Sequence, residues 1–411
     1  MVTHNCRSNA LPSPQAQFEN YPKGPYFQKR AHDLLASGIF NADGPEWKRQ
    51  RKVAANIFNV KNFRDFVEGV FADEMSILSR TLDRASADGA VLDLHELFFK
   101  FTLDGFAKIG FGINLESLSS EVPNPFAEAF DRAQRVVDRR MVSPFWRIEE
   151  AVLPVGREMK RDLKTIHDFG LNVVLERRAD PEKDSYNDLL SMFMRSKTES
   201  GNPPSDRELA DVVLNMIIAG RDTTAQALSW TFYMLAQNPE AEAKLVNEIM
   251  ETLGDNKTPT YEQIRTMRYA NAVFHETLRL WPSVPKEIKQ ALADDVLPDG
   301  TQVDAGALIV WVPFAMGRSK HIWGADAKQF KPERWLGEKD LQPSNWDYPV
   351  FNGGPRICLG RSMAELEGVY VLVSILRRFK VTVRNVDTVA YDSSLTLPMK
   401  TGLMCSFAAR F

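Results

Sequence analysis

Cysteine and long hydrophobic runs are both scarce in this chain of 411 residues. The three cysteines, Cys6, Cys358 and Cys405, have no paired spacing, which argues against a disulfide framework and favours a reducing compartment. No stretch approaches the roughly 18 apolar residues that a membrane-spanning helix needs, since the longest covers only residues 307–316. The first residues resemble neither a signal peptide nor an anchor. The net charge of −3 gives no general attraction to nucleic acid or anionic lipid.

The chain also lacks any linker or repeat that would divide it. No Pro/Gly/Ser-rich stretch interrupts it, and a hydrophobic content of 44% can fill one large core. We therefore predict a single domain over residues 1–411, mainly α-helical with small β-sheets. Caps and apolar periodicity predict helices over residues 47–58, 62–84, 94–110, 125–140, 157–178, 205–237, 239–253, 268–280 and 359–379. β-Branched and aromatic runs predict strands over residues 308–314, 379–383 and 403–407.

Cys358 lies in the segment Phe351-Asn-Gly-Gly-Pro-Arg-Ile-Cys-Leu-Gly360, directly before a predicted helix. A helix N-terminus favours an anion, so this position favours a thiolate that can bind a metal. Gly360 lets a flat ligand approach the backbone, and Arg356 can pair with a carboxylate at the edge of that ligand. A thiolate ligand, a flat face and an anionic rim together describe haem. The alternative is that Cys358 is a small buried thiol without a ligand.

The cysteine segment resembles the signature of the haem-thiolate monooxygenases, the cytochrome P-450 superfamily. Four further motifs resemble those of the family and follow in the family's order. They are Trp47-Lys-Arg-Gln-Arg51, Ala219-Gly-Arg-Asp-Thr-Thr224, Glu276-Thr-Leu-Arg279 and Pro332-Glu-Arg-Trp335. The resemblance implies the cytochrome P-450 fold and a monooxygenase that uses haem b, with Cys358 as the axial thiolate.

The same resemblance implies which residues contact the haem. Phe351, Gly360 and Ala219 are implied to lie against it, and Arg356 to pair with its edge. Trp47 and Arg51 are implied to reach one of its propionates. Their spacing of four places them on one helix face, although without the other motifs they would indicate only a basic helix with one anchoring Trp.

Eukaryotic relatives carry more residues at their N-terminus than this chain. The resemblance therefore implies that the chain begins inside the fold and lacks the N-terminal anchor, the first helix and part of the N-terminal sheet. We accordingly expect residues 1–36 to be poorly ordered. The resemblance implies that full-length members lie on the cytosolic face of the endoplasmic reticulum membrane. A chain without the anchor is expected in the cytoplasm, and contact with a membrane surface stays open.

The predicted central helix carries two groups for proton transfer. Oxygen bound to haem iron needs two protons, for which Asp222 supplies an acid and Thr223 a hydroxyl. Gly220 lowers helix stability, leaves room beside the haem and lets the helix open locally. The alternative is that Thr223 only hydrogen-bonds back to the preceding turn.

Glu276 and Arg279 lie three residues apart on one helix face, a spacing that most often gives an exposed surface pair. The resemblance implies instead a buried pair, joined by Arg334, that holds the cysteine loop in place. Its role is then structural, and breaking it would leave an unpaired buried charge.

Electrons must come from a partner, because the sequence contains no flavin or nicotinamide domain. The resemblance implies a separate NADPH-dependent flavoprotein reductase, and a basic patch on the cysteine side would suit its docking. The candidates for this patch are Lys48, Arg49, Lys52 and Arg361.

Segments such as residues 101–106 and 294–301 resemble the fatty-acid and alkane ω-hydroxylase branch of the family. They make a long-chain fatty acid the first predicted substrate. By family position the pocket residues are Ala219, Val284, Pro285, Leu395 and Leu397. Their apolar character suits a lipid chain, but plain core residues would look the same. Two alternatives stay open: a reductase-independent enzyme that rearranges fatty-acid hydroperoxides, and a non-catalytic haem-binding remnant.

Overall fold

The computed structural model describes residues 18–59, 63–254, 256, 258–337 and 343–410. The predicted class is confirmed, since 63% of the structure is helix and 7% is strand. Among the described residues, none of the helices is both long and apolar enough to cross a bilayer. The helices are α1 (Gly24–Leu35), α2 (Gly44–Ala55), α3 (Phe63–Asp88), α4 (Leu94–Phe111), α5 (Pro125–Val142), α6 (Trp146–Val152), α7 (Pro154–Ala179), α8 (Leu189–Arg195), α9 (Asp206–Ile217), α10 (Thr223–Gln237), α11 (Pro239–Leu253), α12 (Tyr261–Thr266), α13 (Arg268–Leu280), α14 (Pro313–Met316), α15 (Lys320–Trp323) and α16 (Arg361–Arg378).

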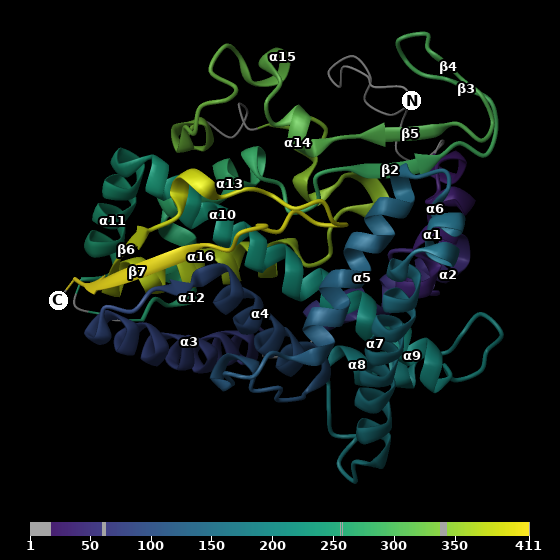
Figure 1. Cartoon of the computed structure of the whole chain (residues 1–411), viewed down its shortest axis with the longest axis horizontal. Coiled ribbons are helices and arrows are strands. Elements are labelled where there is room, and N and C mark those ends of the chain that lie inside the picture. The colour runs from purple at the N-terminus through teal and green to yellow at the C-terminus, as the bar shows by residue number, and fades with distance from the viewer. Residues whose placement is uncertain (1–17, 60–62, 255, 257, 338–342, 411) are drawn as a thin grey trace.

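Two large hydrophobic cores and a small third cluster, formed by Tyr21, Ala291, Leu297 and Val303, fill the described part of the chain. The first lies among α3, α4, α10, α11, α13 and α16 and includes the fully buried Trp230 and Phe274. The second lies among α1, α5, α7, α8 and α9 and includes Phe130 and Ile217. Figure 1 shows the two groups of helices on opposite sides of the molecule. Because α9 belongs to the second core and α10 to the first, the segment between these helices lies where the cores meet.

Among the described residues, the strands form three small antiparallel sheets. In the first, β7 (Met404–Ala409) lies between β1 (Leu92–Asp93) and β6 (Phe379–Val383) and carries the buried Cys405. In the second, β2 (Glu287–Gln290) pairs with β5 (Leu308–Trp311), with Lys289 opposite Ile309. The third pairs β3 (Asp295–Val296) with β4 (Gln302–Val303). Strand β2 of the second sheet carries Lys289, whose pKa is lowered by the nearby charge of Arg356 in the cysteine loop.

The predicted helix over residues 205–237 forms, but it is divided by a π-helical segment at Ile218–Asp222. Its start is confirmed, because the Glu208 N–H donates to Ser205 Oγ at 3.3 Å and the Ser205 N–H donates to the Glu208 carboxylate at 2.8 Å. The local opening predicted near Gly220 is also present. A Cβ at Gly220 would lie 1.9 Å from the Phe106 ring, whereas the room predicted beside the haem stays a prediction. Gly220 makes room for α4.

The expectation of a poorly ordered N-terminus was wrong for residues 18–36. Helix α1 forms there, and the carboxylate of Asp43 accepts hydrogen bonds from the N–H groups of Lys23 at 2.8 Å and Gly24 at 3.0 Å. These bonds satisfy donors at the helix start, where no carbonyl of the helix can reach them. The remainder of that prediction, and Cys6, lie outside the described residues.

Candidate cofactor and catalytic site

The cysteine loop turns tightly between residues 351 and 360. Positive φ angles occur at Asn352 (61°) and Gly354 (62°), whereas Gly353 is extended, so only the second glycine makes the predicted bend. The N–H of Cys358 donates to the carbonyl of Phe351 at 2.8 Å, which closes the loop. The loop thus holds Cys358 immediately before α16, as predicted.

Cys358 is exposed as a residue, but the protein around its thiol affects the protonation of the sulfur. Burial raises the pKa of the thiol, and the Gly360 N–H and the Arg51 guanidinium offset the rise only in part. The balance of these effects therefore favours the protonated thiol. A bound metal cation would reverse the balance, because a coordinating thiol is deprotonated.

Helix α2 brings Trp47 and Arg51 to the cysteine loop. Arg51 donates to the carbonyl of Ile357 at 2.7 Å. Trp47 is buried, and the guanidinium carbon of Arg356 lies 4.5 Å from the centre of its ring. Arg356 also donates to Asp43 at 2.6 Å. The structure therefore joins the two predicted motifs around Arg356.

Sequence analysis missed Lys289, a buried cation in strand β2. Its side chain is 7% exposed, and within the described part of the chain its Nζ has no hydrogen-bond partner. Burial and the nearby charges of Lys23 and Arg356 lower its pKa to about 6. The Nε of Arg356 is buried without a partner as well. A lysine among alternating strand residues is the signal that could have found this position, because lysine is almost never buried unless it is paired.

This arrangement fits haem b. Buried cationic groups without acceptors need anionic partners, and haem carries two carboxylates on a flat iron-containing ring. Arg356 and Lys289 would hold the carboxylates, while Cys358 would supply the thiolate ligand. A Cβ added at Gly360 would lie 4.0 Å from the Cys358 sulfur, an ordinary van der Waals distance, so the predicted approach of a flat ligand to Gly360 stays a prediction.

Asp222 and Thr223 follow one another, but their side chains have different partners. The Thr223 hydroxyl donates to the carbonyl of Ala219 at 2.7 Å, which is the back-bonding common in helices. The Asp222 carboxylate is buried and accepts hydrogen bonds from Gln134 at 2.6 Å and Arg221 at 3.0 Å. The structure therefore does not join the two predicted proton-transfer groups by a hydrogen bond.

The surroundings of Asp222 make it a titratable acid near neutral pH. Burial raises its pKa to about 6, and the negative charge of Asp131 adds to the rise. Hydrogen bonds from Arg221 and Gln134 act in the opposite direction. Asp222 can therefore gain and lose a proton at physiological pH, as a proton donor in catalysis must. Sequence analysis missed Gln134 and Asp131, which have no motif around them.

The Glu276–Arg279 pair is fully buried, as the resemblance implied. Two parallel hydrogen bonds of 2.7 and 2.8 Å join the side chains. Arg334 approaches Glu276 to 3.4 Å, and the indole N–H of Trp335 donates to it at 2.9 Å. Arg279 donates further to the carbonyl of Ala327 at 2.6 Å. The group therefore anchors residues 317–335 to α13.

Contact between α13 and the cysteine loop runs through the neighbouring His275. Tyr348 lies three residues before Phe351, the start of the cysteine loop. Its hydroxyl donates to the carbonyl of His275 at 3.2 Å. The His275 ring also lies 3.6 Å from Glu365 of α16. Burial lowers the pKa of His275, which favours its neutral form. The Glu276–Arg279 pair thus reaches the loop indirectly.

The five predicted substrate-pocket residues lie on three segments that meet at α10. Ser283 donates its hydroxyl hydrogen to the Thr223 carbonyl at 2.7 Å, which holds residues 283–285 against that helix. The N–H of Leu397 donates to Gln226 of α10 at 2.8 Å. Leu397 is itself buried in the core, whereas Ala219, Val284, Pro285 and Leu395 are partly exposed.

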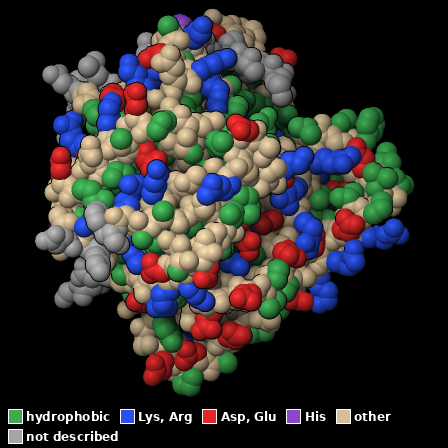
Figure 2. Space-filling view, turned by 60° about the vertical axis from the view of Figure 1, so that its left-hand side comes forward, with side chains coloured by type: hydrophobic (Ala, Val, Ile, Leu, Met, Phe, Trp, Pro, Cys, Tyr) green, Lys and Arg blue, Asp and Glu red, His purple; other side chains and the backbone are tan. Residues whose placement is uncertain are grey.

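Three of the four residues in the predicted basic patch have acidic partners. Lys48 pairs with Glu19 at 2.7 Å, Arg49 with Glu46 at 2.6 Å, and Arg361 with Glu365 at 2.8 Å. These pairs weaken the positive field that a patch would need. On the face shown in Figure 2, basic and acidic side chains are likewise interspersed.

Comparisons with known proteins agree with this geometry. The family model described as Cytochrome P450 matches residues 1–405. The Cytochrome P450 monooxygenase cyp1 of Mycosarcoma maydis is 37% identical over 96% of this chain and 66% of its own length. Cytochrome P450 704B1 of Arabidopsis thaliana is 35% identical over 96% of this chain and 84% of its own length. Cytochrome P450 94A1 of Vicia sativa is 37% identical over 89% of this chain and 73% of its own length.

Proposed function

This chain belongs to the cytochrome P450 family of haem-thiolate monooxygenases, and we propose that it hydroxylates a lipid. The reaction inserts one atom of O2 into a C–H bond, and the favoured substrate is a long-chain fatty acid, hydroxylated at or near its ω end. A separate NADPH-dependent flavoprotein reductase supplies the electrons. The observation that carries the proposal is an exposed Cys358 in a loop whose Arg356 Nε, like the buried Nζ of Lys289 nearby, has no hydrogen-bond partner among the described residues.

Each predicted site residue then has a proposed role in one unit over residues 1–411. Bound haem would supply the chemistry that activates O2. Cys358 is its ligand, and Trp47, Arg51, Arg356 and Lys289 hold its edge, while Phe351, Gly360 and Ala219 contact it. Asp222 and Thr223 manage protons. Glu276, Arg279 and Arg334 stabilise the fold next to the cysteine loop.

The substrate class rests on residue character. Val284, Pro285 and Leu395 are apolar and partly exposed beside α10, which suits a hydrocarbon chain. The sequence segments that resemble the ω-hydroxylase branch point the same way. A lipid substrate and a membrane-bound reductase would place the reaction at the cytosolic face of the endoplasmic reticulum.

The first experiment is the carbon-monoxide difference spectrum of the dithionite-reduced protein and of a Cys358→Ala variant. We expect the Soret band of a haem thiolate in the wild type and its loss in the variant. A wild-type band at the position of the inactive form, or no band, would contradict the proposed cofactor site.

Turnover then separates the candidate reactions. Fatty acid with reductase and NADPH should give a hydroxylated product, whereas fatty-acid hydroperoxide alone should not be rearranged. The intact Asp222 and Thr223 favour the first reaction, because a rearrangement needs no protons for O2. Product from the hydroperoxide only would replace the proposal by a reductase-independent function.

A further inference from the structure

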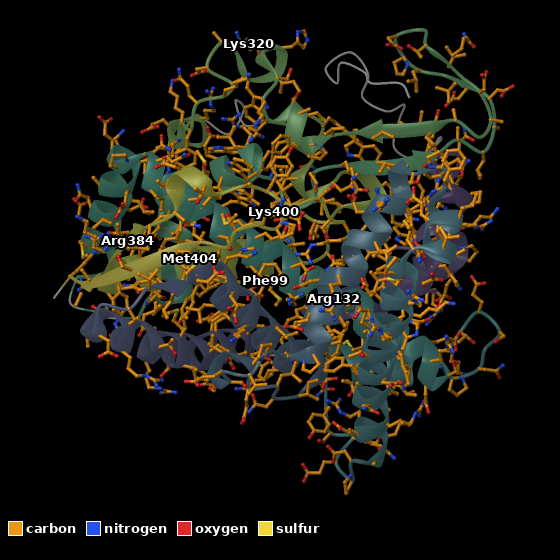
Figure 3. The ribbon with its side chains drawn as sticks, viewed as in Figure 1. Phe99, Arg132, Lys320, Arg384, Lys400 and Met404 are labelled. Carbon is orange, nitrogen blue, oxygen red and sulfur yellow. The ribbon has the colours of Figure 1, made fainter. Side chains whose placement is uncertain are left out.

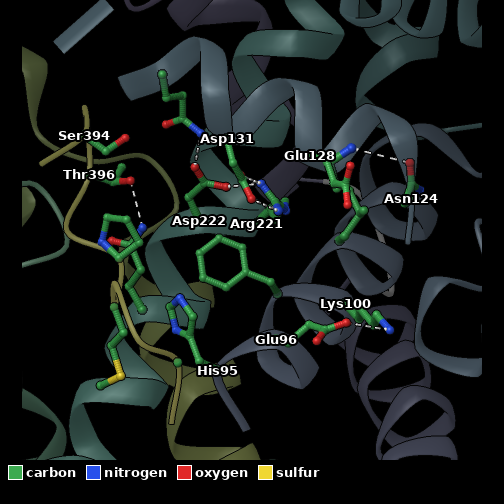
Figure 4. Close-up of a pocket in the computed structure, with 18 of the residues that line it drawn as sticks. His95, Glu96, Lys100, Asn124, Glu128, Asp131, Arg221, Asp222, Ser394 and Thr396 are labelled. Carbon is green, nitrogen blue, oxygen red and sulfur yellow. Dashed lines mark hydrogen bonds and ion pairs between the residues drawn. The ribbon is translucent and has the colours of Figure 1, made fainter. Parts of the chain in front are cut away.

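A cavity of about 390 Å³ lies next to Asp222 and is separate from the cofactor site. Its walls come from α4, α5, the π-helical segment and residues 394–402, which follow one another around Asp222 in Figure 4. In Figure 3 two of the lining residues, Phe99 and Lys400, lie near the centre of the molecule, between β7 and α5. None of the residues assigned to haem binding lines this cavity, whereas Asp222 does.

The lining is suited to water. Ser117 Oγ, Gln134 Oε1 and Arg221 Nε are buried, line the cavity and have no hydrogen-bond partner among the described residues. Buried polar atoms of this kind are normally satisfied by ordered water when there is room for it. The volume is far above the roughly 15 Å³ that one water needs, so several waters fit in a connected group.

A chain of charged groups links Asp222 to the protein surface. Asp222 is 1% exposed, and its neighbour Arg221 is 3% exposed. Arg221 forms two hydrogen bonds to Asp131, of 2.7 and 3.2 Å, and a third to Asp222. The Asp131 side chain is 36% exposed, so among these three side chains Asp131 is the one in contact with solvent. Figure 4 shows the three side chains in contact at the cavity wall.

We propose that this cavity is the proton inlet of the enzyme, in which water returns a proton to Asp222 after each donation and Asp131 is the positioning residue that controls this step. The inference rests on the proposed monooxygenase function. The balance is RH + O2 + 2e⁻ + 2H⁺ → ROH + H2O. The flavoprotein reductase supplies the two electrons, and both protons enter from bulk solvent through the cavity water.

The charges around Asp222 predict how Asp131 acts. Asp131 holds Arg221 away from an exclusive pair with Asp222, and its negative charge raises the pKa of Asp222. Without that charge, Arg221 would stabilise the Asp222 carboxylate alone, and the pKa of Asp222 would fall. His95 contributes no charge, because burial lowers its pKa to about 4. The other charged groups that line the cavity are Asp93, Glu96, Lys100, Glu128, Arg135 and Lys400.

The test compares Asp131→Asn with a matched control, Glu128→Gln. Glu128 lies one turn earlier on α5 and lines the same cavity, but its carboxylate pairs with the exposed Arg132 at 3.5 Å. The readout is product formed per NADPH oxidised, measured across pH and in light and heavy water. For Asp131→Asn we expect an unchanged carbon-monoxide spectrum, which would show that the haem site is intact. The yield of product per NADPH should fall severalfold at neutral pH. The pH profile of that yield should shift to lower pH, and its solvent isotope effect should increase. Glu128→Gln should match the wild type.

Hydrogen peroxide gives a second comparison, because it brings both protons and both electrons with it. Peroxide-driven hydroxylation should therefore be the same in Asp131→Asn and the wild type. If Asp131→Asn does not fold, Ala127→Phe replaces it as the test, because a Phe side chain there fills the cavity without changing a charge. This variant should also lose coupling. Wild-type coupling and pH profile in either folded variant would overturn the inlet. Absence of product from the wild type by both routes would instead overturn the monooxygenase proposal.

Discussion

Lys289 is a cation buried in a strand, where it costs free energy unless an anion is close. Within the described residues its Nζ finds no acceptor, and Lys23 and Arg356 add like charge. Of the acidic residues, Glu287 has the largest electrostatic effect on Lys289, but its carboxylate pairs with Lys23 at 2.9 Å. A ligand carboxylate would therefore explain why a lysine is buried at position 289, whereas no group in the described part of the chain does.

We predict that Lys289→Met weakens haem retention. A charge-assisted hydrogen bond contributes roughly 1.5–3 kcal/mol, which corresponds to a haem loss rate roughly ten- to a hundredfold faster. Transfer of haem to apomyoglobin measures this rate. Lys380→Met, on the exposed edge of β6, serves as the control. Equal rates in the two variants would remove Lys289 from the haem site.

At the scale of elements, α13 is held by one buried ion pair with several further hydrogen bonds. Removing one partner of such a pair leaves a charge buried and unpaired, which costs much more than the pair itself contributes. The chain contains the same Glu-x-x-Arg spacing on the surface of α12, where Glu262 lies 3.7 Å from Arg265 and both side chains are more than 60% exposed. The two pairs differ only in their tertiary surroundings.

We predict that Glu276→Ala destabilises the protein by about 3–5 kcal/mol, whereas Glu262→Ala costs about 0.5 kcal/mol or less. Urea denaturation followed by circular dichroism measures both changes. We also expect loss of haem in the first variant, because residues 317–335 would lose their anchor on α13. A haem-loaded Glu276→Ala variant of normal stability would refute the structural role of the pair.

A second connection between elements joins α16 to α10. Glu367 of α16 is 3% exposed and is hydrogen-bonded to Thr224, directly after Thr223. Burial raises the pKa of Glu367 to about 8. Between its usual value of 4.5 and about 8, the folded protein holds a proton that the unfolded chain has lost. Folding stability therefore falls as pH rises through this window.

Glu367→Gln should remove this fall, because an amide has no proton to lose in this range. The variant should match the wild type near pH 4.5 and become more stable than it as pH rises, by at most about 4–5 kcal/mol above pH 8. Denaturation midpoints across pH measure the difference. Glu240→Gln, on the exposed surface of α11, is the control. A difference that does not change with pH would show that Glu367 is charged in the folded protein.

At the scale of the whole molecule, the proposed haem site is assembled from separate parts of the chain. Trp47 and Arg51 come from α2, Lys289 from β2, and Arg356 and Cys358 from the loop before α16. Arg51 contacts the loop over 306 positions of sequence, and Arg356 contacts Asp43 over 313. A ligand bound among these parts holds them together.

Haem loading should therefore raise the midpoint of thermal unfolding. Ligand at a thousand times its dissociation constant adds about 4 kcal/mol of stability. Differential scanning calorimetry of protein with graded haem occupancy measures the shift. Cys358→Ala should show a smaller one, because its haem lacks the thiolate ligand. Equal midpoints at all occupancies would mean that haem binds folded and unfolded chains alike.

Much of the fold was predictable because its signals are local. The bounds of α11 and α13 match the prediction, since Pro239 begins one and a run of apolar positions defines the other. Helices α1, α6, α8, α12, α14 and α15 were missed. They are short or begin without a strong cap, so tertiary packing stabilises them more than their own sequence does.

For the site, the printed sequence was enough to find Cys358, the Asp222-Thr223 pair and the Glu276–Arg279 pair, because each lies in a motif whose spacing is fixed by one loop or one helix turn. Only tertiary structure could bring Gln134 to Asp222 across 88 positions, Asp131 to Arg221 across 90, and Lys289 to Arg356. These contacts depend on burial and on which helices pack together. A sequence pattern encodes the face of a helix, but the partner of that face is chosen by the folded core as a whole.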